Sequence, residues 1–304
     1  MSSKISNRTE TEPLHLRWWG GFLRSCLTKF VFLSIRFQTL GLEDFAVKRS
    51  NTGTIIMIAL LAAIFGFSMG KFVDIESTYL VEKLQNQEIA DMVEEGEGED
   101  GEIKDINAKN EDGILKQYEE VYGRNNDFIG WLKVPDTNIN YPVMYTPDDP
   151  EHYLRLNFDK QYAISGTPFV GEGCDVDNSD SFVIYGHMMN NRTMFAQLKD
   201  YESKDFWQNH QTVNFDTIHD HRTYQIFAAF KTEIPSAGQE GFRYYDLVGE
   251  LNEQEYKDLL DGIKAKQFYD TGKAPTEGQQ IMILSTCSYH AKNGRCVVAA
   301  YRIS

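Results

Sequence analysis

The most apolar stretch of the chain runs from Ser50 to Gly70 and contains no charged residue. Its central run, TIIMIALLAAIFGFSMG, is apolar and nearly long enough to cross a bilayer as a helix, and basic residues flank it on both sides. A cleavable signal peptide begins within a few residues of the N-terminus, whereas about fifty residues precede this segment. We therefore predict an uncleaved transmembrane anchor over residues 50–71, with a buried core helix as the alternative.

Basic residues are concentrated before this segment. They are Lys4, Arg8, Arg17, Arg24, Lys29, Arg36, Lys48 and Arg49. The stretch after the segment is dominated by Asp and Glu. Because cytoplasmic flanks of membrane spans carry an excess of Lys and Arg, we predict a single-pass protein of the cell membrane, with residues 1–49 in the cytoplasm and the C-terminal bulk outside.

The basic segment 1–49 has apolar residues near every fourth position between Leu14 and Phe37, with Arg and Lys interleaved. This spacing suits an amphipathic helix that lies on the inner membrane surface, with Cys26 on its apolar face. The Gly20-Gly21 pair argues against a helix. An irregular cytoplasmic tail is therefore an equal alternative.

Residues 72–113 are polar and acidic. We predict that they form an extracellular linker, which begins as a polar helix over 72–95 and continues as the flexible spacer GEGEDGEIKDINAKNEDG. The spacer has too few apolar residues to bury a core of its own.

From Ile114 to Ser304 the composition becomes that of a folded domain. A predicted helix, ILKQYEEVYG, comes first, and short β-prone runs separated by turn residues follow it. This pattern is typical of a closed or sandwiched β fold. One segment, LNEQEYKDLLDGIKAKQFY, has helical spacing instead, so we predict a helix inserted before the strand that ends at Cys287. The fold class is thus mainly β with helices.

The composition excludes some functions. A net charge of −15 and a pI near 4.9 argue against nucleic-acid binding, which needs clustered Lys and Arg. The cysteines are too few and too scattered for a disulfide scaffold, and no pair has CxxC spacing. They are Cys26, Cys174, Cys287 and Cys296.

The run IMILSTCSYHAKNGRCVVAAYRI predicts a β-hairpin, because two β-prone stretches flank the turn signal Asn293-Gly294. Cys287 and Arg295 then lie near one another at the mouth of the hairpin, while Cys296 points to the opposite face from Arg295. A thiol beside a permanent cation favours the nucleophilic thiolate, and a guanidinium can stabilise an oxyanion. From the hairpin alone, a structural cysteine and a surface or salt-bridged arginine are the alternatives.

A second β-prone run, SFVIYGH, ends at His187. A histidine at a strand end can act as general acid for a leaving amine and as general base for an incoming one, although a hydrogen-bonded structural histidine is the ordinary alternative. His290 is closer to Cys287 in sequence, but we expect it to be exposed in the turn. His219 and His221 could hold a metal, yet a plain hairpin turn is favoured there, so no metal site is predicted.

The chain combines the run YGH, the run LSTC and Arg295 eight residues after Cys287, all in a β-rich domain behind a single anchor. This combination resembles the sortase family of Gram-positive cell-surface transpeptidases. The family's signature strand ends in TLxTC, and here Ile283 stands where the first Thr is usual. Residues 125–170, the helix before them and the inserted helix are similar to class B sortases. The resemblance covers residues 114–304 and implies an eight-stranded closed β-barrel, with the inserted helix between the sixth and seventh strands.

The resemblance implies a cysteine transpeptidase without cofactor or metal. At the matched positions, Cys287 attacks the Thr carbonyl in a C-terminal sorting signal (NPxTx or LPxTG-like) of a secreted protein, His187 protonates the departing amine, and Arg295 steadies substrate and oxyanion. An amine of peptidoglycan or its lipid-linked precursor then resolves the thioacyl intermediate, which joins the protein to the cell wall. We expect Tyr185, Ser285 and Thr286 to line the groove and contact the substrate. Packing is the alternative for each of them.

Other interpretations fit less well. A papain-type or NlpC-type hydrolase usually has its Cys before its His, and an L,D-transpeptidase has an Arg two residues after the Cys, where this chain has Tyr289. A pilin-polymerising sortase with a lysine acceptor is the nearest alternative, and its lid could use Asp149-Pro150, which we interpret as a turn. A non-catalytic wall-binding module is a further alternative. A site cysteine outside the cell must stay reduced, so we expect Cys174 to be an exposed or idle thiol that does not pair with it.

Overall fold

The computed structural model describes residues 52–97, 105–235, 240–288 and 293–304. The chain divides into two compact units, Met1–Gly70 and Lys71–Ser304. The predictions for the basic segment 1–49, including Cys26, and for His290 fall outside the described residues.

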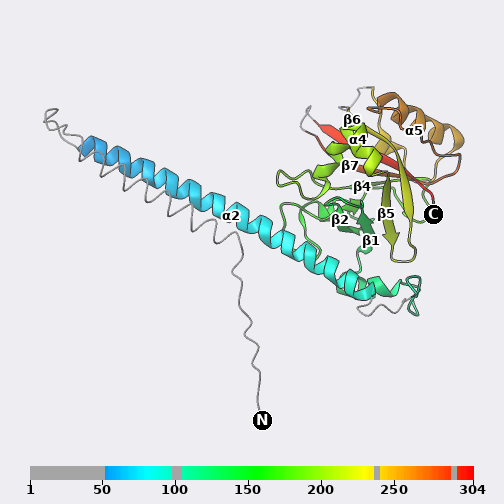
Figure 1. The fold of residues 1–304 in the computed structure, drawn as a ribbon, viewed down its shortest axis with the longest axis horizontal. Helices are drawn as coiled ribbons and strands as arrows, with labels where there is room; N and C mark the ends of the chain where they lie inside the picture. Colours follow the sequence, from blue (N-terminus) through cyan, green and yellow to red (C-terminus); the bar gives the residue numbers. More distant parts are fainter. Residues whose placement is uncertain (1–51, 98–104, 236–239, 289–292) are drawn as a thin grey trace, which may run out of the picture. The chain divides into compact units, whose positions relative to one another are not determined.

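Helix α2 (Thr52–Glu97) contains the predicted anchor (Figure 1). Its most apolar window, found between Ile56 and Glu94, has a mean hydropathy of 2.1, and none of that window is buried inside the protein. Large side chains such as Phe67, which is 71% exposed, lie along it. Exposure of this kind is unfavourable in water and favourable in hydrocarbon. The first half of α2 is therefore long and apolar enough to cross a membrane.

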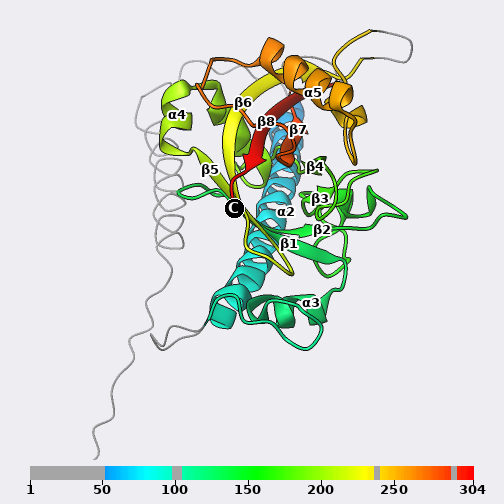
Figure 2. The ribbon, with the colours of Figure 1, turned by 90° about the vertical axis from the view of Figure 1, so that its right-hand side faces the viewer.

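Eight strands within the described ranges form a closed barrel. They are β1 (Phe128–Lys133), β2 (Asn140–Met144), β3 (Phe169–Val170), β4 (Ser181–Tyr185), β5 (Thr212–Thr217), β6 (Thr223–Glu233), β7 (Ile281–Cys287) and β8 (Gly294–Arg302). Their order around the barrel is β1-β2-β3-β4-β7-β8-β6-β5, and pairing of β1 with β5 closes it (Figure 2). The β2–β3 and β4–β7 pairs are parallel, and the others are antiparallel. The predicted eight-stranded closed barrel is confirmed.

Short helices precede the first strand and connect the later ones. They are η1 (Lys116–Tyr118), α3 (Glu119–Arg124), η2 (His152–Arg155), η3 (Phe195–Glu202), α4 (Lys204–Asn209), η4 (Tyr244–Asp246) and α5 (Glu253–Lys266). The first two form the helical segment predicted to begin near Ile114.

Closure of the barrel depends on a glycine in β1. Gly130 is in register with Thr217 of β5, next to a register shift in β1. A Cβ at this position would lie 2.2 Å from the Asp216 carbonyl oxygen. Only a residue without a side chain allows β1 and β5 to approach this closely.

The two faces of the barrel sheet bury different clusters. Alternate residues point inward and form an inner cluster, which includes Phe182, Met282, Leu284, Cys296, Val298 and Ala300. The other residues of the same strands point outward and form an outer cluster with α5, which includes Val183, Ile281, Ile283, Val297, Ala299, Leu259 and Ile263. The wall of the barrel is therefore apolar on both faces where α5 covers it.

Helix α5 is the predicted inserted helix, and it lies between β6 and β7 in the chain. The Asn252 side chain accepts from the Glu255 backbone N–H while the Glu255 side chain accepts from the Asn252 N–H, a capping box that fixes the start of the helix. Tyr256, Leu259 and Ile263 recur at helical spacing and are buried. This stripe attaches α5 to the outer face of the barrel.

The part of α2 after Lys71 packs against the β domain. Ile89, Ala90 and Val93 are buried in an N-terminal cluster, which also contains Leu115 and Tyr118. The polar helix predicted over 72–95 is therefore present. It also supplies an apolar face to the domain, because these three apolar residues fall on one side of the helix.

Residues 105–113 are held against the domain, although we expected them to be the end of a flexible spacer. The Asn110 side chain accepts hydrogen bonds from the backbone N–H groups of Asp112 and Ile114. Lys109 pairs with Asp220 in the turn between β5 and β6, at 3.6 Å. Polar contacts hold this stretch in place of the apolar burial that it lacks.

The α5 stripe supports a stability prediction. Leu259 is 0% exposed, so replacing it with Ala leaves a cavity and should lower the free energy of unfolding by about 2–5 kcal/mol. Leu260→Ala is the matched control, because Leu260 is only half-buried on the same helix and should cost less. Urea denaturation of the full chain in detergent micelles measures both values. Equal losses for the two variants would contradict the packing described above.

Candidate active site

The predicted hairpin is formed by β7 and β8. Cys287 is the last residue of β7, and its register partner in β8 is Arg295. Residues that face one another across an antiparallel pair point to the same side of the sheet. Asn293, at the predicted turn, has a φ of 59° in the left-handed region that Asn tolerates. The thiol and the guanidinium therefore start from neighbouring positions on one face.

That face is the outer one. Val297 and Ala299, which alternate with Cys296 and Val298, belong to the outer cluster, and the latter two belong to the inner cluster. The alternation predicted for β8 is confirmed, and Arg295 lies on the outer side. Cys287 is exposed, whereas Cys296 is 0% exposed.

His187 reaches the same place through the parallel pairing of β4 with β7. Tyr185 is in register with Ser285, and the Gly186 N–H continues the ladder by donating to the Ser285 carbonyl at 3.1 Å. His187 and Cys287 each come two residues after this register pair. Neighbouring parallel strands thus place the imidazole and the thiol at the same level, just beyond the strand ends.

A backbone carbonyl fixes the orientation of the half-buried His187 ring. Its Nε2 lies 2.8 Å from the Leu154 carbonyl oxygen in η2. Since a carbonyl only accepts, Nε2 carries the hydrogen, and Nδ1 of the neutral ring has the free lone pair. Burial lowers the pKa of His187, the Leu154 hydrogen bond opposes that shift, and the charge of Arg155 adds to it. The neutral imidazole is therefore favoured at neutral pH, with Nδ1 available for proton transfer.

The three residues line one groove, here called the Cys287 groove, of about 680 Å³. Side chains from the loops around the barrel end complete it, and they include Asp149, Pro150, Glu151, Leu154, Glu172, Ile234, Tyr245 and Asp246. The volume suits several residues of an extended peptide or a comparable ligand. Four carboxylates and one guanidinium, that of Arg295, are among these lining residues.

The expected substrate-contact residues differ in exposure. Tyr185 is half-buried, lines the groove, and packs against Phe169 with ring centroids 5.7 Å apart. Burial raises the pKa of its phenol, which stays protonated at neutral pH. Ser285 borders the groove but is 0% exposed, and its Oγ shares a hydrogen bond of 2.7 Å with the Tyr244 hydroxyl. In this structure Ser285 packs beneath the surface of the groove, where it is bonded to Tyr244.

Thr286 is also buried. Its register partner is Cys296, so its side chain is on the inner face of the barrel. Thr286 Oγ1 has no hydrogen-bond partner among the described residues. Only the backbone of Thr286 can contribute to the groove, because the side chains of a strand alternate.

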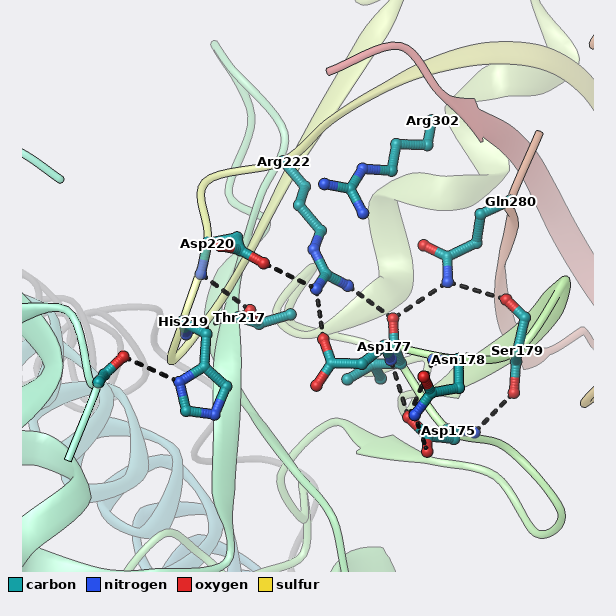
Figure 3. Close-up of polar contacts among 12 residues, drawn as sticks. Asp175, Asp177, Asn178, Ser179, Thr217, His219, Asp220, Arg222, Gln280 and Arg302 are labelled. Carbon is teal, nitrogen blue, oxygen red and sulfur yellow. Dashed lines mark hydrogen bonds and ion pairs between the residues drawn. The ribbon is translucent and has the colours of Figure 1, made fainter. Parts of the chain in front are cut away.

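The loop between β3 and β4, which supplies Glu172 to the groove, is held by a buried arginine (Figure 3). The Arg222 side chain donates to the Val176 carbonyl at 2.6 Å and pairs with Asp177. Gln280, just before β7, donates to the same carbonyl at 3.1 Å. A buried cation bonded to a carbonyl and a carboxylate satisfies both partners and fixes the loop.

Several groove residues have no signal in the sequence. Leu154 contributes a backbone carbonyl, and Tyr245 and Asp246 come from η4, a single turn between β6 and α5. Asp149-Pro150 lies in a turn, as we predicted, and both residues also border the groove. Residues of this kind are found only when the chain is folded, because loops from distant segments bring them together.

Cys174 is buried, which corrects the part of our expectation that placed it at the surface. Its exposed fraction is 3%, and its Sγ accepts from the Val183 N–H at 3.4 Å. Burial raises the pKa of this thiol to about 11. The reason is that the loop after β3 folds inward and joins the inner cluster.

His219 and His221 lie in the predicted turn between β5 and β6. His219 Nδ1 is 3.0 Å from the Gly113 carbonyl oxygen, and His221 Nδ1 is 2.8 Å from Asp216 Oδ2. Both rings thus hold the turn to neighbouring backbone and side chains.

Comparisons with known proteins agree with this geometry. A family model described as Sortase domain matches residues 132–303. Sortase B of Staphylococcus aureus (strain NCTC 8325 / PS 47) is 27% identical over 257 residues, which cover 84% of this chain and 97% of the relative. Sortase B of Listeria monocytogenes serovar 1/2a is 28% identical over 227 residues, which cover 72% and 85%.

Solved structures are similar as well. Sortase B from B. anthracis in complex with AAEK2 superimposes with a TM-score of 0.61 at 26% identity, covering 74% of this chain and 97% of that one. A Staphylococcus aureus sortase B–substrate complex has a TM-score of 0.57 at 26% identity, covering 73% and 94%.

The barrel and these relatives define the class of protein, a cysteine transpeptidase. The chain belongs to the sortase family, since the family model spans more than half of it, and the relatives identify class B.

The lowered pKa of His187 leads to a prediction about stability. The unfolded chain, whose histidine titrates near 6.5, binds a proton more readily than the folded protein. The contribution of neutral His187 to the free energy of unfolding is thus fully present above about pH 6.5. It is lost as the pH falls from there towards the pKa of His187 in the folded protein. Urea denaturation between about pH 7.5 and 5.5 should show a steeper loss for the wild type than for His187→Gln. Parallel curves would contradict the assigned environment.

Proposed function

We propose that this protein is a membrane-anchored sortase that cleaves a C-terminal sorting signal after Thr and transfers the secreted protein to an amine of peptidoglycan or its precursor. One observation carries the proposal. The exposed Cys287 faces Arg295 in register and lies level with His187 in one groove of about 680 Å³. That set supplies a nucleophile, a proton carrier and a fixed cation, which acyl transfer requires.

The first half of the reaction makes a thioester. In the reactive form, the thiol proton of Cys287 has moved to Nδ1 of neutral His187, which gives a thiolate and an imidazolium. The thiolate sulfur attacks the Thr carbonyl carbon, and the carbonyl oxygen becomes an oxyanion close to Arg295. When the C–N bond breaks, imidazolium His187 gives its Nδ1 proton to the leaving amine. The Leu154 carbonyl keeps the opposite edge of the ring fixed during this transfer. A thioacyl enzyme and a free amine are the products.

The second half transfers the acyl group. An acceptor amine attacks the thioester carbon and loses a proton to neutral His187, and the C–S bond breaks to release the thiolate. Solved relatives support a peptide substrate and an amine acceptor, because one is a sortase B–substrate complex and another is sortase B complexed with triglycine. A pilin-type reaction with a protein lysine as acceptor uses the same residues and is distinguished only by the acceptor.

The long apolar helix supports membrane anchoring. Basic residues concentrated before it support a cytoplasmic N-terminus and an extracellular catalytic domain. Secreted substrates and the cell wall are both found on that outer side.

Mass spectrometry tests the reaction. The full chain in detergent micelles is incubated with NPxTx or LPxTG peptides, with and without triglycine or a lysine-containing stem peptide. We expect cleavage after Thr, an acyl adduct on Cys287 and its transfer to the amine, with none of these in Cys287→Ala. A folded wild type that forms no adduct with either peptide would refute the proposal.

Arg295 gives an independent test. Arg295→Lys keeps the charge but loses the planar array of donors, and Arg295→Ala loses both. We expect kcat/KM to fall by about 100-fold or more in Arg295→Ala, as for loss of an oxyanion donor, with partial activity in Arg295→Lys. Arg302, at the far end of the same strand, provides the control Arg302→Ala. Full activity in Arg295→Ala would exclude the assigned role.

A further inference from the structure

The carbonyl that orients His187 also lies against the backbone of Gly166. A Cβ at Gly166, whose φ is 57°, would lie 2.5 Å from the Leu154 oxygen. Leu154 O therefore accepts from the imidazole and also lies directly against the backbone of residue 166. Any movement of the segment around Gly166 would change the position of the carbonyl, and with it the His187 ring.

The segment 162–167 is tied to η2 by a ladder of hydrogen bonds. The Ala163 N–H donates to the Arg155 carbonyl at 2.9 Å, and the Thr167 N–H donates to the Tyr153 carbonyl at 3.1 Å. The Arg155 guanidinium donates to the Ile164 carbonyl at 2.5 Å. These bonds join residues 162–167 to the η2 residues on both sides of Leu154, and so hold the two segments together.

Helix α2 holds this piece in place. The Ile164 N–H donates to Glu82 Oε1 of α2 at 2.8 Å, and Glu82 is only 8% exposed. Asn157 donates to Gln85 of α2 at 3.2 Å. The cavity between Glu82, Gln85, Asn157 and Gly166 is only about 10 Å³, so α2 is closely packed at this contact, while a larger groove of about 520 Å³ borders another side of Glu82. A buried carboxylate that accepts a hydrogen bond from a backbone N–H makes a strong and directional contact.

We propose that Glu82 is a positioning residue for catalysis, which acts through Ile164 and the Leu154 carbonyl to fix the orientation of His187. The helical segment after the anchor is then part of the active-site scaffold. Its docking controls how well the imidazole is aligned, and undocking lowers the rate. This inference rests on the proposed role of His187 as the proton carrier.

Three substitutions at one position separate positioning from stability. Glu82→Ala removes the acceptor, Glu82→Asp shortens it by one methylene, and Glu82→Gln keeps an oxygen in place. The exposed Glu76 on the same helix gives the control Glu76→Ala. All are made in the full chain, in detergent micelles. Rates are divided by the fraction of Cys287 that a sorting peptide can acylate, so a less stable variant loses active molecules without losing rate per site.

A misaligned proton carrier should lower kcat per acylatable site by about 10-fold to 100-fold in Glu82→Ala and Glu82→Asp. KM should change by less than about twofold, because the groove that holds the peptide is intact. Glu82→Gln and Glu76→Ala should remain near the wild type. If Glu82→Ala does not fold, the comparison of Glu82→Asp with Glu82→Gln decides.

Three results would overturn the inference alone: a wild-type rate per site in folded Glu82→Asp, a loss in Glu82→Gln as large as in Glu82→Asp, or an equal loss in Glu76→Ala. An inactive wild type would overturn the proposed function and this inference together. The two failures are therefore distinguishable in one set of assays.

Discussion

The parallel pairing of β4 with β7 is the constraint on which the site depends. His187 and Cys287 are separated by most of the second half of the chain, and only the register of Tyr185 with Ser285 brings them to the same level. A shift of one residue would turn Cys287 towards the inner cluster, where Thr286 now lies. The apolar side chains of Met282 and Leu284 oppose that shift, because they would then leave the interior.

The barrel has a packed interior, so the site can form only on its outside. The inner cluster fills the lumen, and α5 covers much of the outer wall of β6, β7 and β8. Cys287 and Arg295, at the adjoining ends of β7 and β8, are not part of that outer cluster, and Cys287 is exposed. Tyr244, which is buried beside this end and bonded to Ser285, forms the boundary between covered wall and open groove.

The folded unit that holds the site is larger than the barrel and begins at Lys71. Removing the part of α2 after Lys71 would expose the N-terminal cluster, in which Ile89 and Val93 are buried together with Leu115 and Tyr118. The same helix contacts the segment that supports the Leu154 carbonyl. A polar segment that looks like a spacer in the sequence thus has a structural role, because a few apolar residues on one side of a helix suffice to dock it.

The sequence alone determined what depends on neighbouring residues. The turn signal Asn293-Gly294 and strand alternation were enough to predict that Cys287 and Arg295 meet and that Cys296 faces away, and helical spacing was enough to predict α5. The eight-stranded barrel was predicted by resemblance to the sortase family. Only the tertiary structure showed that Thr286 and Cys174 are buried, and that Leu154 orients His187. These features depend on contacts between segments far apart in the chain, whose register and packing no local pattern specifies.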